Sequence, residues 1–188
     1  MSPGNLRYAG RMSKPRPPRR ISKSYLENVS LYYLERFSSS AENLRRVLLR
    51  RVERAARFHD DDPAEGVALV ADLIERYQRS GLLDDKQYAG AKTRSLHRRG
   101  ASTRAIRQQL SARGIEPDTI DAVLTELTDD AQGEPDLAAA HAYARRRRLG
   151  PYRVAEAEEG ARDRDLAALG RAGFSWEVAR AVIDGERE

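Results

Sequence analysis

Apolar residues along this chain recur at intervals of three and four positions, which is the spacing of one face of an α-helix. Clear examples are the stripes Tyr25, Val29, Tyr32, Tyr33 and Ile120, Val123, Leu124, Leu127. A sustained alternation with a period of two, typical of half-buried strands, is almost absent. The pattern therefore predicts an all-α protein.

Capping residues and glycines divide the chain into helices. Ser39 and Glu42 form an S-x-x-E capping box, which predicts a helix with Ser39 at its N-cap. Asp62-Pro63 predicts another start, with proline as the first helical residue. Further N-caps and helix ends are expected at Asp84, Ser102, Ser175 and at Gly81, Gly100, Gly114, Gly150, Gly173.

The helices repeat in groups of three. Residues 112–124 match residues 171–183, since in both a glycine precedes an apolar residue and then a helix with the same apolar positions. Small repeated units gain stability by stacking on their neighbours. We expect three stacked three-helix units over 21–82, 83–132 and 133–188, forming an elongated, curved molecule. The third unit carries about nine extra residues near 154–162.

Several classes of protein are disfavoured by composition. The chain of 188 residues has no cysteine, so disulfides, thiolate metal sites and cysteine nucleophiles are excluded. No apolar stretch approaches a membrane span, and no apolar segment follows the basic N-terminus, so we expect a cytoplasmic protein. The polar run His59 to Asp62 lies in consecutive loop positions, which disfavours a metal site. With no recognisable catalytic motif, we expect neither an enzyme nor a cofactor.

The net charge of +5 is unevenly distributed. Residues 1–23 hold seven bases and no acid, and residues 1–20, rich in proline, are predicted to be a disordered tail that contacts nucleic acid or aids solubility. Residues 86–115 hold eight bases and no acid, and residues 137–155 hold five arginines and no acid. Such windows are usually solvated helix surfaces, but two of them on repeated helices suggest an anionic partner.

The candidate partner-binding residues are the cations of these two windows other than Lys86. Guanidinium groups suit both phosphate and carboxylate, so the partner is either a DNA backbone or an acidic protein surface. No helix carries a recognisable base-reading arrangement, which disfavours specific DNA readout. The twelve candidates are Lys92, Arg94, Arg98, Arg99, Arg104, Arg107, Arg113, Arg145, Arg146, Arg147, Arg148 and Arg153.

Over residues 21–184 the sequence resembles the RecX family of regulatory proteins. The resemblance is carried by the order and spacing of short motifs at Ile21–Leu26, Ser39–Asn43, Ser80–Ala89, Arg98–Gly100, Arg113–Ile115, Arg145–Arg153 and Gly173–Trp176. The sequence departs from the family pattern in three places: the basic tail, a first unit lengthened by residues 58–63, and the insertion near 156–160.

The resemblance implies a fold and a function. Members of the family are built from tandem three-helix repeats and bind the filament that RecA recombinase forms on single-stranded DNA. They block filament growth or promote disassembly, and so suppress ATP hydrolysis and strand exchange in recombination, DNA repair and the SOS response. Some also bind DNA directly. The expected partners are therefore RecA, the RecA–ssDNA filament and DNA itself, bound by a monomer.

Overall fold

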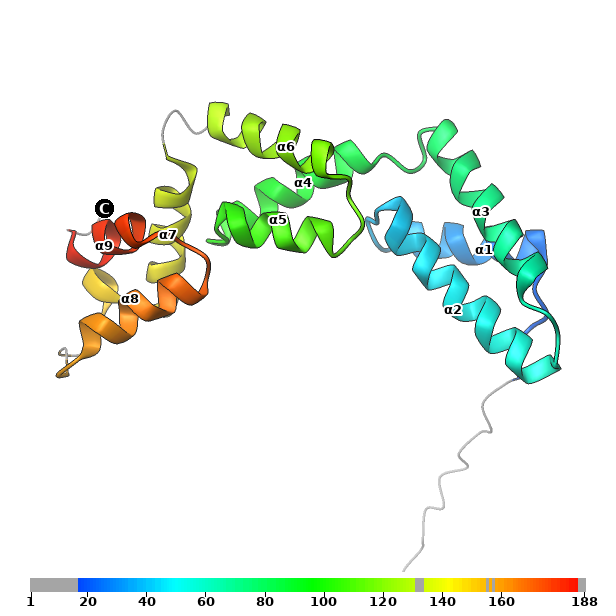
Figure 1. Ribbon diagram of the computed structural model, residues 1–188, viewed down its shortest axis with the longest axis horizontal. Coiled ribbons are helices and arrows are strands. Elements are labelled where there is room, and N and C mark those ends of the chain that lie inside the picture. The colour runs from blue at the N-terminus through cyan, green and yellow to red at the C-terminus, as the bar shows by residue number, and fades with distance from the viewer. Residues whose placement is uncertain (1–16, 131–133, 155, 157, 186–188) are drawn as a thin grey trace, which may run out of the picture.

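The chain forms an arch of helices in a computed structural model that describes residues 17–130, 134–154, 156 and 158–185 (Figure 1). All regular structure in these ranges is helical, which confirms the all-α prediction. The α-helices are α1 (Lys23–Leu34), α2 (Ala41–His59), α3 (Ala64–Arg79), α4 (Asp85–Arg98), α5 (Thr103–Ser111), α6 (Pro117–Asp130), α7 (Pro135–Arg147), α8 (Ala161–Arg171) and α9 (Trp176–Asp184), with a 3₁₀ turn, η1 (Gly150–Tyr152), between α7 and α8.

Each consecutive group of three helices encloses its own hydrophobic core. Leu44 and Leu48 lie at the centre of the first core, Ile106 and Leu110 of the second, and Leu169 of the third. We refer to α1–α3, α4–α6 and α7–α9 as units 1, 2 and 3. The tandem three-helix architecture and the elongated, curved shape are thus as predicted, whereas the residue boundaries of the units stay a prediction.

The cap residues agree with the sequence pattern at most positions. Asp84, Ser102 and Ser175 each accept a hydrogen bond from the backbone N–H three residues ahead, as predicted. The N-cap of α2, however, is Ser40 and not Ser39. The buried Ser39 hydroxyl is held by the Ser40 carbonyl and the Asn43 side chain, which leaves Ser40 to cap the helix.

Two helix boundaries, the start of α3 and the end of α7, differ from the predicted ones. Helix α3 begins at Ala64 with Pro63 before it, although the Asp62 carboxylate still accepts from the Ala64 N–H at 2.9 Å. Helix α7 ends before Gly150, because Arg148 takes the left-handed conformation with φ of 58°. Helix α8 begins at Ala161, directly after the left-handed Gly160.

The predicted helix ends at Gly81, Gly100, Gly114 and Gly173 are confirmed by the positive φ angles of these glycines. Leu83, two residues before α4, is buried in the core of unit 1.

Most of the predicted tail, residues 1–16, lies outside the described residues. Residues 17–20 lie against the corner between α2 and α3. The Pro18 carbonyl is 2.8 Å from His59 Nε2, and Arg20 forms an ion pair with Asp61. The run from His59 to Asp62 therefore holds the entering chain and the start of α3.

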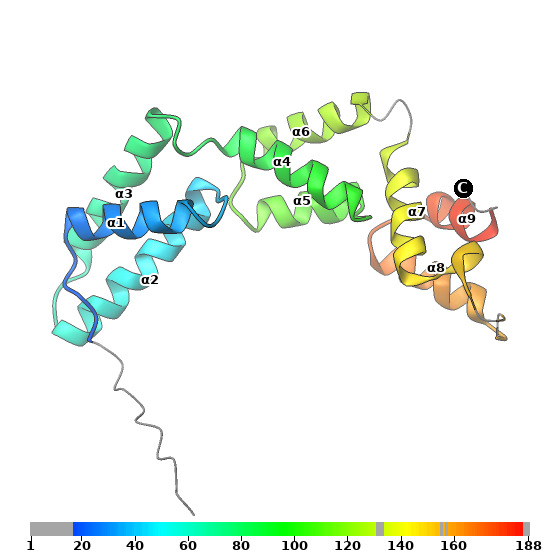
Figure 2. The same ribbon diagram turned by 180° about the vertical axis from the view of Figure 1, so that it is seen from behind.

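The second helices of the units follow one another end to end. Along the lower side of the arch, the C-terminal end of α8 faces the start of α5, and the C-terminal end of α5 faces the start of α2 (Figures 1 and 2). This order brings the negative end of each helix dipole to the positive end of the next, which is electrostatically favourable. The row α8–α5–α2 is the line along which the units are joined.

Candidate functional site

The candidate site is a basic groove between units 2 and 3. It has a volume of about 760 Å³ and is walled by apolar side chains of α4, α5, α7 and α8, among them Leu96 and Ala168. Its lining includes no carboxylate but includes five cationic side chains, which are Lys92, Arg99, Arg146, Arg147 and Arg171. A concave surface of one charge sign with low-dielectric walls concentrates its electric field on an oppositely charged ligand. The lining of the groove is therefore electrostatically complementary to an anion.

Tyr143 organises the arginines of the third unit. The Arg146 and Arg147 guanidinium carbons lie 5.7 and 5.4 Å from the centre of its ring. The ring in turn meets Phe174 of the third core edge-on, with centroids 5.9 Å apart. A cation over an aromatic face is held by the ring quadrupole. Tyr143 thus orients two of the groove's cations from the core of unit 3.

The structure brings together four of the twelve predicted residues. Lys92, Arg99, Arg146 and Arg147 line the groove, and the others do not. Arg107 is paired with Asp121 at 2.6 Å, and Arg145 lies 5.1 Å from the Tyr152 ring centre. The lining of the groove does not include Arg94, Arg98, Arg104, Arg113 or Arg148, and a partner-binding role for these residues stays a prediction.

Arg153 has a structural partner inside unit 3. The buried Asp165 carboxylate accepts hydrogen bonds from Arg153 Nη2 at 2.6 Å and from the Gly150 N–H at 2.8 Å. Beside it, the buried His141 has its Nδ1 atom 2.9 Å from the Tyr152 hydroxyl. These contacts anchor the turn that carries Gly150 to Arg153 onto the core.

Arg171 belongs to the groove but was not among the predicted residues. It lies outside the two acid-free windows, since α8 also carries Asp163 and Asp165. The repeat itself holds the signal: Arg171 occupies the position of Ala112, two residues before the glycine that ends the second helix. Because the ends of these helices face the neighbouring unit, a cation at this position of the repeat lies close to the junction between two units.

The groove depends on a joint that fastens unit 3 to unit 2. The Ser102 hydroxyl caps α5 and also donates to the Ala172 carbonyl at 2.8 Å. The next backbone N–H, of Thr103, donates to the Asp136 carboxylate at 2.7 Å. Backbone groups at the two helix ends that meet in this joint, the start of α5 and the end of α8, thereby gain hydrogen-bond partners.

The same joint fastens unit 2 to unit 1. The Ser40 hydroxyl caps α2 and donates to the Arg113 carbonyl at 2.6 Å, and the Ala41 N–H donates to the Asp85 carboxylate at 2.8 Å. Burial raises the pKa of Asp85, an effect that the Ala41 N–H opposes and that the nearby Asp84 and Glu116 reinforce. The serine and the aspartate thus occupy equivalent places in both joints.

The first joint is flanked by an ion-pair cluster. Glu42 accepts from Arg45 at 2.6 Å and from Arg46 at 2.8 Å, and Arg46 also donates to the Ala112 carbonyl of unit 2. The hydrogen bond from Arg45 lowers the pKa of Glu42, although partial burial acts in the opposite direction. The Glu42 side chain also lies against Gly114, where an added Cβ would overlap it.

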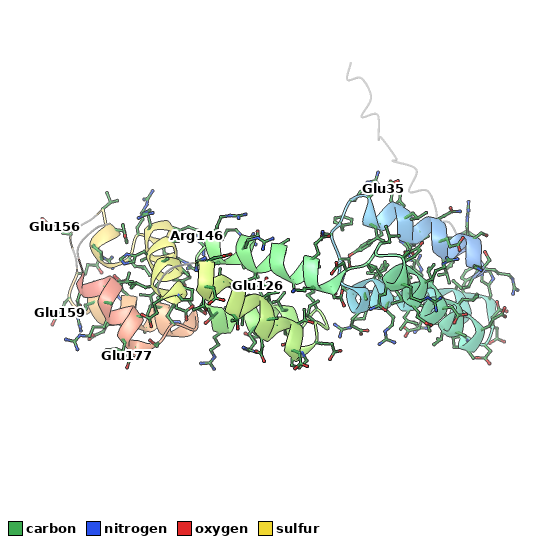
Figure 3. The ribbon with its side chains drawn as sticks, turned by 90° about the horizontal axis from the view of Figure 1, so that it is seen from above. Glu35, Glu126, Arg146, Glu156, Glu159 and Glu177 are labelled. Carbon is green, nitrogen blue, oxygen red and sulfur yellow. The ribbon has the colours of Figure 1, made fainter. Side chains whose placement is uncertain are left out.

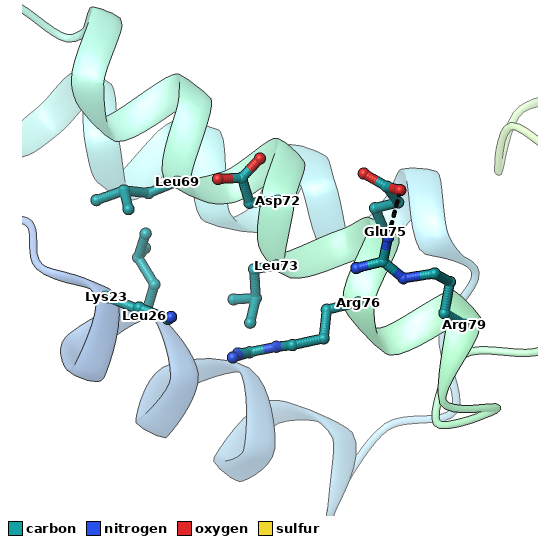
Figure 4. Close-up of a pocket in the computed structure, with 8 residues that line it drawn as sticks. All are labelled: Lys23, Leu26, Leu69, Asp72, Leu73, Glu75, Arg76 and Arg79. Carbon is teal, nitrogen blue, oxygen red and sulfur yellow. Dashed lines mark hydrogen bonds and ion pairs between the residues drawn. The ribbon is translucent and has the colours of Figure 1, made fainter.

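A smaller cavity in unit 1 has a different character. About 290 Å³ lies between α1 and α3, over Leu26 and Leu73 (Figure 4). Charges of both signs surround it. Glu75 pairs with Arg79 at 2.8 Å, and Arg76 pairs with Glu27 of α1. Because acids and bases offset each other here, this cavity is a weaker candidate for an anion than the groove.

Within the described residues, no group of three or more side chains is arranged to hold a metal ion. In the same part of the chain, no helix is both long enough and apolar enough to cross a membrane.

Comparisons with known proteins identify the relatives of this chain. The sequence model of the RecX second three-helix domain matches residues 84–124. The regulatory protein RecX of Myxococcus xanthus (strain DK1622) is 43% identical over 171 residues, which is 90% of each chain. The regulatory protein RecX of Agrobacterium fabrum (strain C58 / ATCC 33970) is 32% identical over 160 residues, covering 85% of this chain and 82% of the relative.

A solved structure gives the same assignment at the level of the fold. The crystal structure of RecX from Lactobacillus salivarius aligns with a TM-score of 0.59 at 18% identity, and covers 86% of this chain and 94% of that one. The three-helix units and their order are thus shared with a protein of distant sequence. Together with the identity of 43% over nearly the whole length, these findings show that the chain belongs to the RecX family of regulatory proteins.

Proposed function

We propose that this protein regulates RecA by binding RecA and RecA–DNA filaments, and that it thereby inhibits filament growth, ATP hydrolysis and strand exchange. It would so modulate recombination, DNA repair and the SOS response. Membership of the RecX family supports the proposal, because its relatives are named regulatory proteins. The observation that carries it is the groove, with five cationic side chains and no carboxylate in its lining.

The groove fits the two anionic surfaces of a nucleoprotein filament. Guanidinium groups bind phosphate oxygens and carboxylates in two-point contacts, so both the DNA backbone and acidic protein side chains are suitable ligands. We place the filament contact at Lys92, Arg99, Arg147 and Arg171, with the wider basic face of units 2 and 3 around them.

The test is the ATPase activity of RecA on single-stranded DNA, with and without this protein. Wild type is expected to inhibit, and a triple variant, Lys92→Glu, Arg99→Glu and Arg147→Glu, to need roughly tenfold more protein for half inhibition, because like charges then meet in the contact. A matched control reverses Arg50, Arg54 and Arg57, which lie exposed on α2 away from the groove. Absence of inhibition by wild type at stoichiometric amounts would refute the proposal.

Two further measurements locate the contact. Reversing Arg94, Arg98 and Arg104 reports whether binding extends beyond the groove, since none of these residues lines it. Binding to DNA without RecA separates filament regulation from the alternative, a non-specific DNA-binding module. That alternative predicts tight binding to bare DNA which weakens steeply with salt, and no additional effect of RecA.

A further inference from the structure

Arg146 differs from its groove neighbours because it is bonded across the junction. Its Nη1 donates to the Arg99 carbonyl of unit 2 at 2.6 Å, while its guanidinium lies over the Tyr143 ring of unit 3. Figure 3 shows Arg146 where α7 meets unit 2. Arg147 lies over the same ring, but no hydrogen bond joins it to unit 2 within the described residues. Two adjacent arginines therefore share one aromatic ring and differ in one contact.

The acceptor of that contact is a helix end. Arg99 is the C-cap of α4, and the last carbonyls of a helix have no partner within it. A cation at this position satisfies the carbonyl and complements the negative end of the helix dipole. Nearby, His97 Nε2 lies 2.7 Å from the Pro135 carbonyl oxygen, which adds a second hydrogen bond between α4 and the start of α7.

The spacing of the groove's cations depends on this attachment. Lys92 and Arg99 come from unit 2, whereas Arg147 and Arg171 come from unit 3. A ligand that contacts both sets needs them at a fixed separation, and a groove that is already ordered binds more tightly than one that is ordered by binding.

We infer that Arg146 is a positioning residue: it fastens α7 to the end of α4 and so sets the width of the groove, while Lys92, Arg99, Arg147 and Arg171 contact the anionic partner. The inference rests on the proposed function for its effect on binding. Its effect on the junction is independent of any partner.

The experiment compares Arg146→Ala and Arg146→Lys with Arg147→Ala, which removes the same charge from the same ring. Because the chain has no cysteine, Gln108→Cys in α5 and Ala167→Cys in α8, both exposed, provide a unique pair of spin labels across the junction. The distance distribution between them is measured by pulsed electron paramagnetic resonance. Binding to RecA filaments is measured at several salt concentrations.

Arg146→Ala is expected to broaden the distance distribution and to weaken filament binding about tenfold, with the salt dependence of wild type, because every contacting cation remains. Arg146→Lys keeps a donor for the Arg99 carbonyl and should restore most of the narrow distribution. Arg147→Ala is expected to leave the distribution unchanged and to make binding less sensitive to salt, because a contact is lost.

An unchanged distribution in Arg146→Ala, or a salt dependence reduced as in Arg147→Ala, would overturn the inference and make Arg146 an ordinary contact. If wild type fails to bind filaments, the proposed function falls. The distance distributions then decide alone whether Arg146 fastens the junction.

Discussion

Each of the two joints along the helix row is formed by a serine and an aspartate at equivalent positions, yet the contacts around the two joints differ. The joint between units 1 and 2 is gathered at the start of α2, which meets the end of α5 and the start of α4. The joint between units 2 and 3 adds a second line of contact, where the end of α4 meets α7. A body attached along one line can rotate about that line, whereas two lines prevent rotation. We therefore expect units 2 and 3 to move together and unit 1 to move against them.

Gly100 is the residue that permits the second line of contact, and its substitution should have the largest effect. It has φ of +78°, and an added Cβ would lie 2.5 Å from the Tyr143 backbone nitrogen and 2.9 Å from the Ala139 carbonyl oxygen. Gly100→Ala should cost roughly 2–4 kcal/mol of unfolding free energy, from the left-handed backbone together with the clash. Urea denaturation measures this loss.

Gly81 provides the matched control for this prediction. It has φ of +74°, but an added Cβ would meet no atom within 4 Å. Gly81→Ala should therefore lose only the backbone contribution, roughly 1–2 kcal/mol. Equal losses in the two variants would mean that the close approach of α7 to α4 contributes nothing, and the distinction between the joints would lose its main support.

The serines should show that the two joints are alike in their shared part. Ser40→Ala and Ser102→Ala each remove an N-cap and a hydrogen bond to the next unit, so each should cost about 2 kcal/mol. Ser175→Ala removes an N-cap and a hydrogen bond to Glu177 of the same helix, but no hydrogen bond to another unit, and should cost about 1 kcal/mol. Thermal and urea unfolding give these values. If the three losses are equal, the hydroxyls contribute only as caps and not as fasteners.

Asp85 sets the first joint apart in its response to pH, with the smallest expected effect. Its pKa is raised in the folded protein, so the protein binds that proton more tightly folded than unfolded. The resulting stabilisation is full below the usual pKa of an aspartate, about 4, and is lost as the pH rises through the folded value. Asp85→Asn, which keeps an acceptor for the Ala41 N–H, should thus match or exceed wild-type stability at pH 7 and lose that advantage in acid.

Asp85→Ala completes this comparison, because it removes the acceptor as well as the charge. Relative to Asp85→Asn, it should cost about 1 kcal/mol at every pH, because the Ala41 N–H is left without its acceptor. Unfolding free energies measured from pH 3 to pH 8 test both variants. A wild-type stability that falls on acidification relative to Asp85→Asn would contradict the assigned direction.

Local features were predictable from the sequence, and contacts between units were not. Gly100 and Ser102 were both expected as helix boundaries, because backbone geometry and capping depend on a few neighbouring residues. Their second roles depend on Tyr143 and Ala172, which lie 43 and 70 residues away in the chain. In the cap, the Ser102 hydroxyl only accepts a hydrogen bond, so its proton remains free to be donated. Which group accepts that proton cannot be predicted from the neighbouring residues.

The acid-free windows were a partial guide to the groove for the same reason. They identified Lys92, Arg99, Arg146 and Arg147, but they also included Arg107 and Arg153, whose partners Asp121 and Asp165 lie outside the windows in sequence and beside them in space. They missed Arg171, which shares its helix with acids that face elsewhere. Charge along a chain and charge on a surface coincide only where one helix face supplies the whole patch.

The joint also has consequences for self-association. Two complementary ends that face outward would let one molecule attach to the next without limit, which is how head-to-tail contacts produce fibres. Here the outer ends are mismatched. Gly160 begins α8 where Ser40 and Ser102 begin their helices, Lys23 begins α1 where Asp85 begins α4, and Asp60 takes the place of the glycines that end α5 and α8. Among the described residues, the serine and aspartate contacts of the joints are thus formed only between consecutive units, where they are already satisfied. The outer ends do not present them, much as β-proteins protect their edge strands against further pairing.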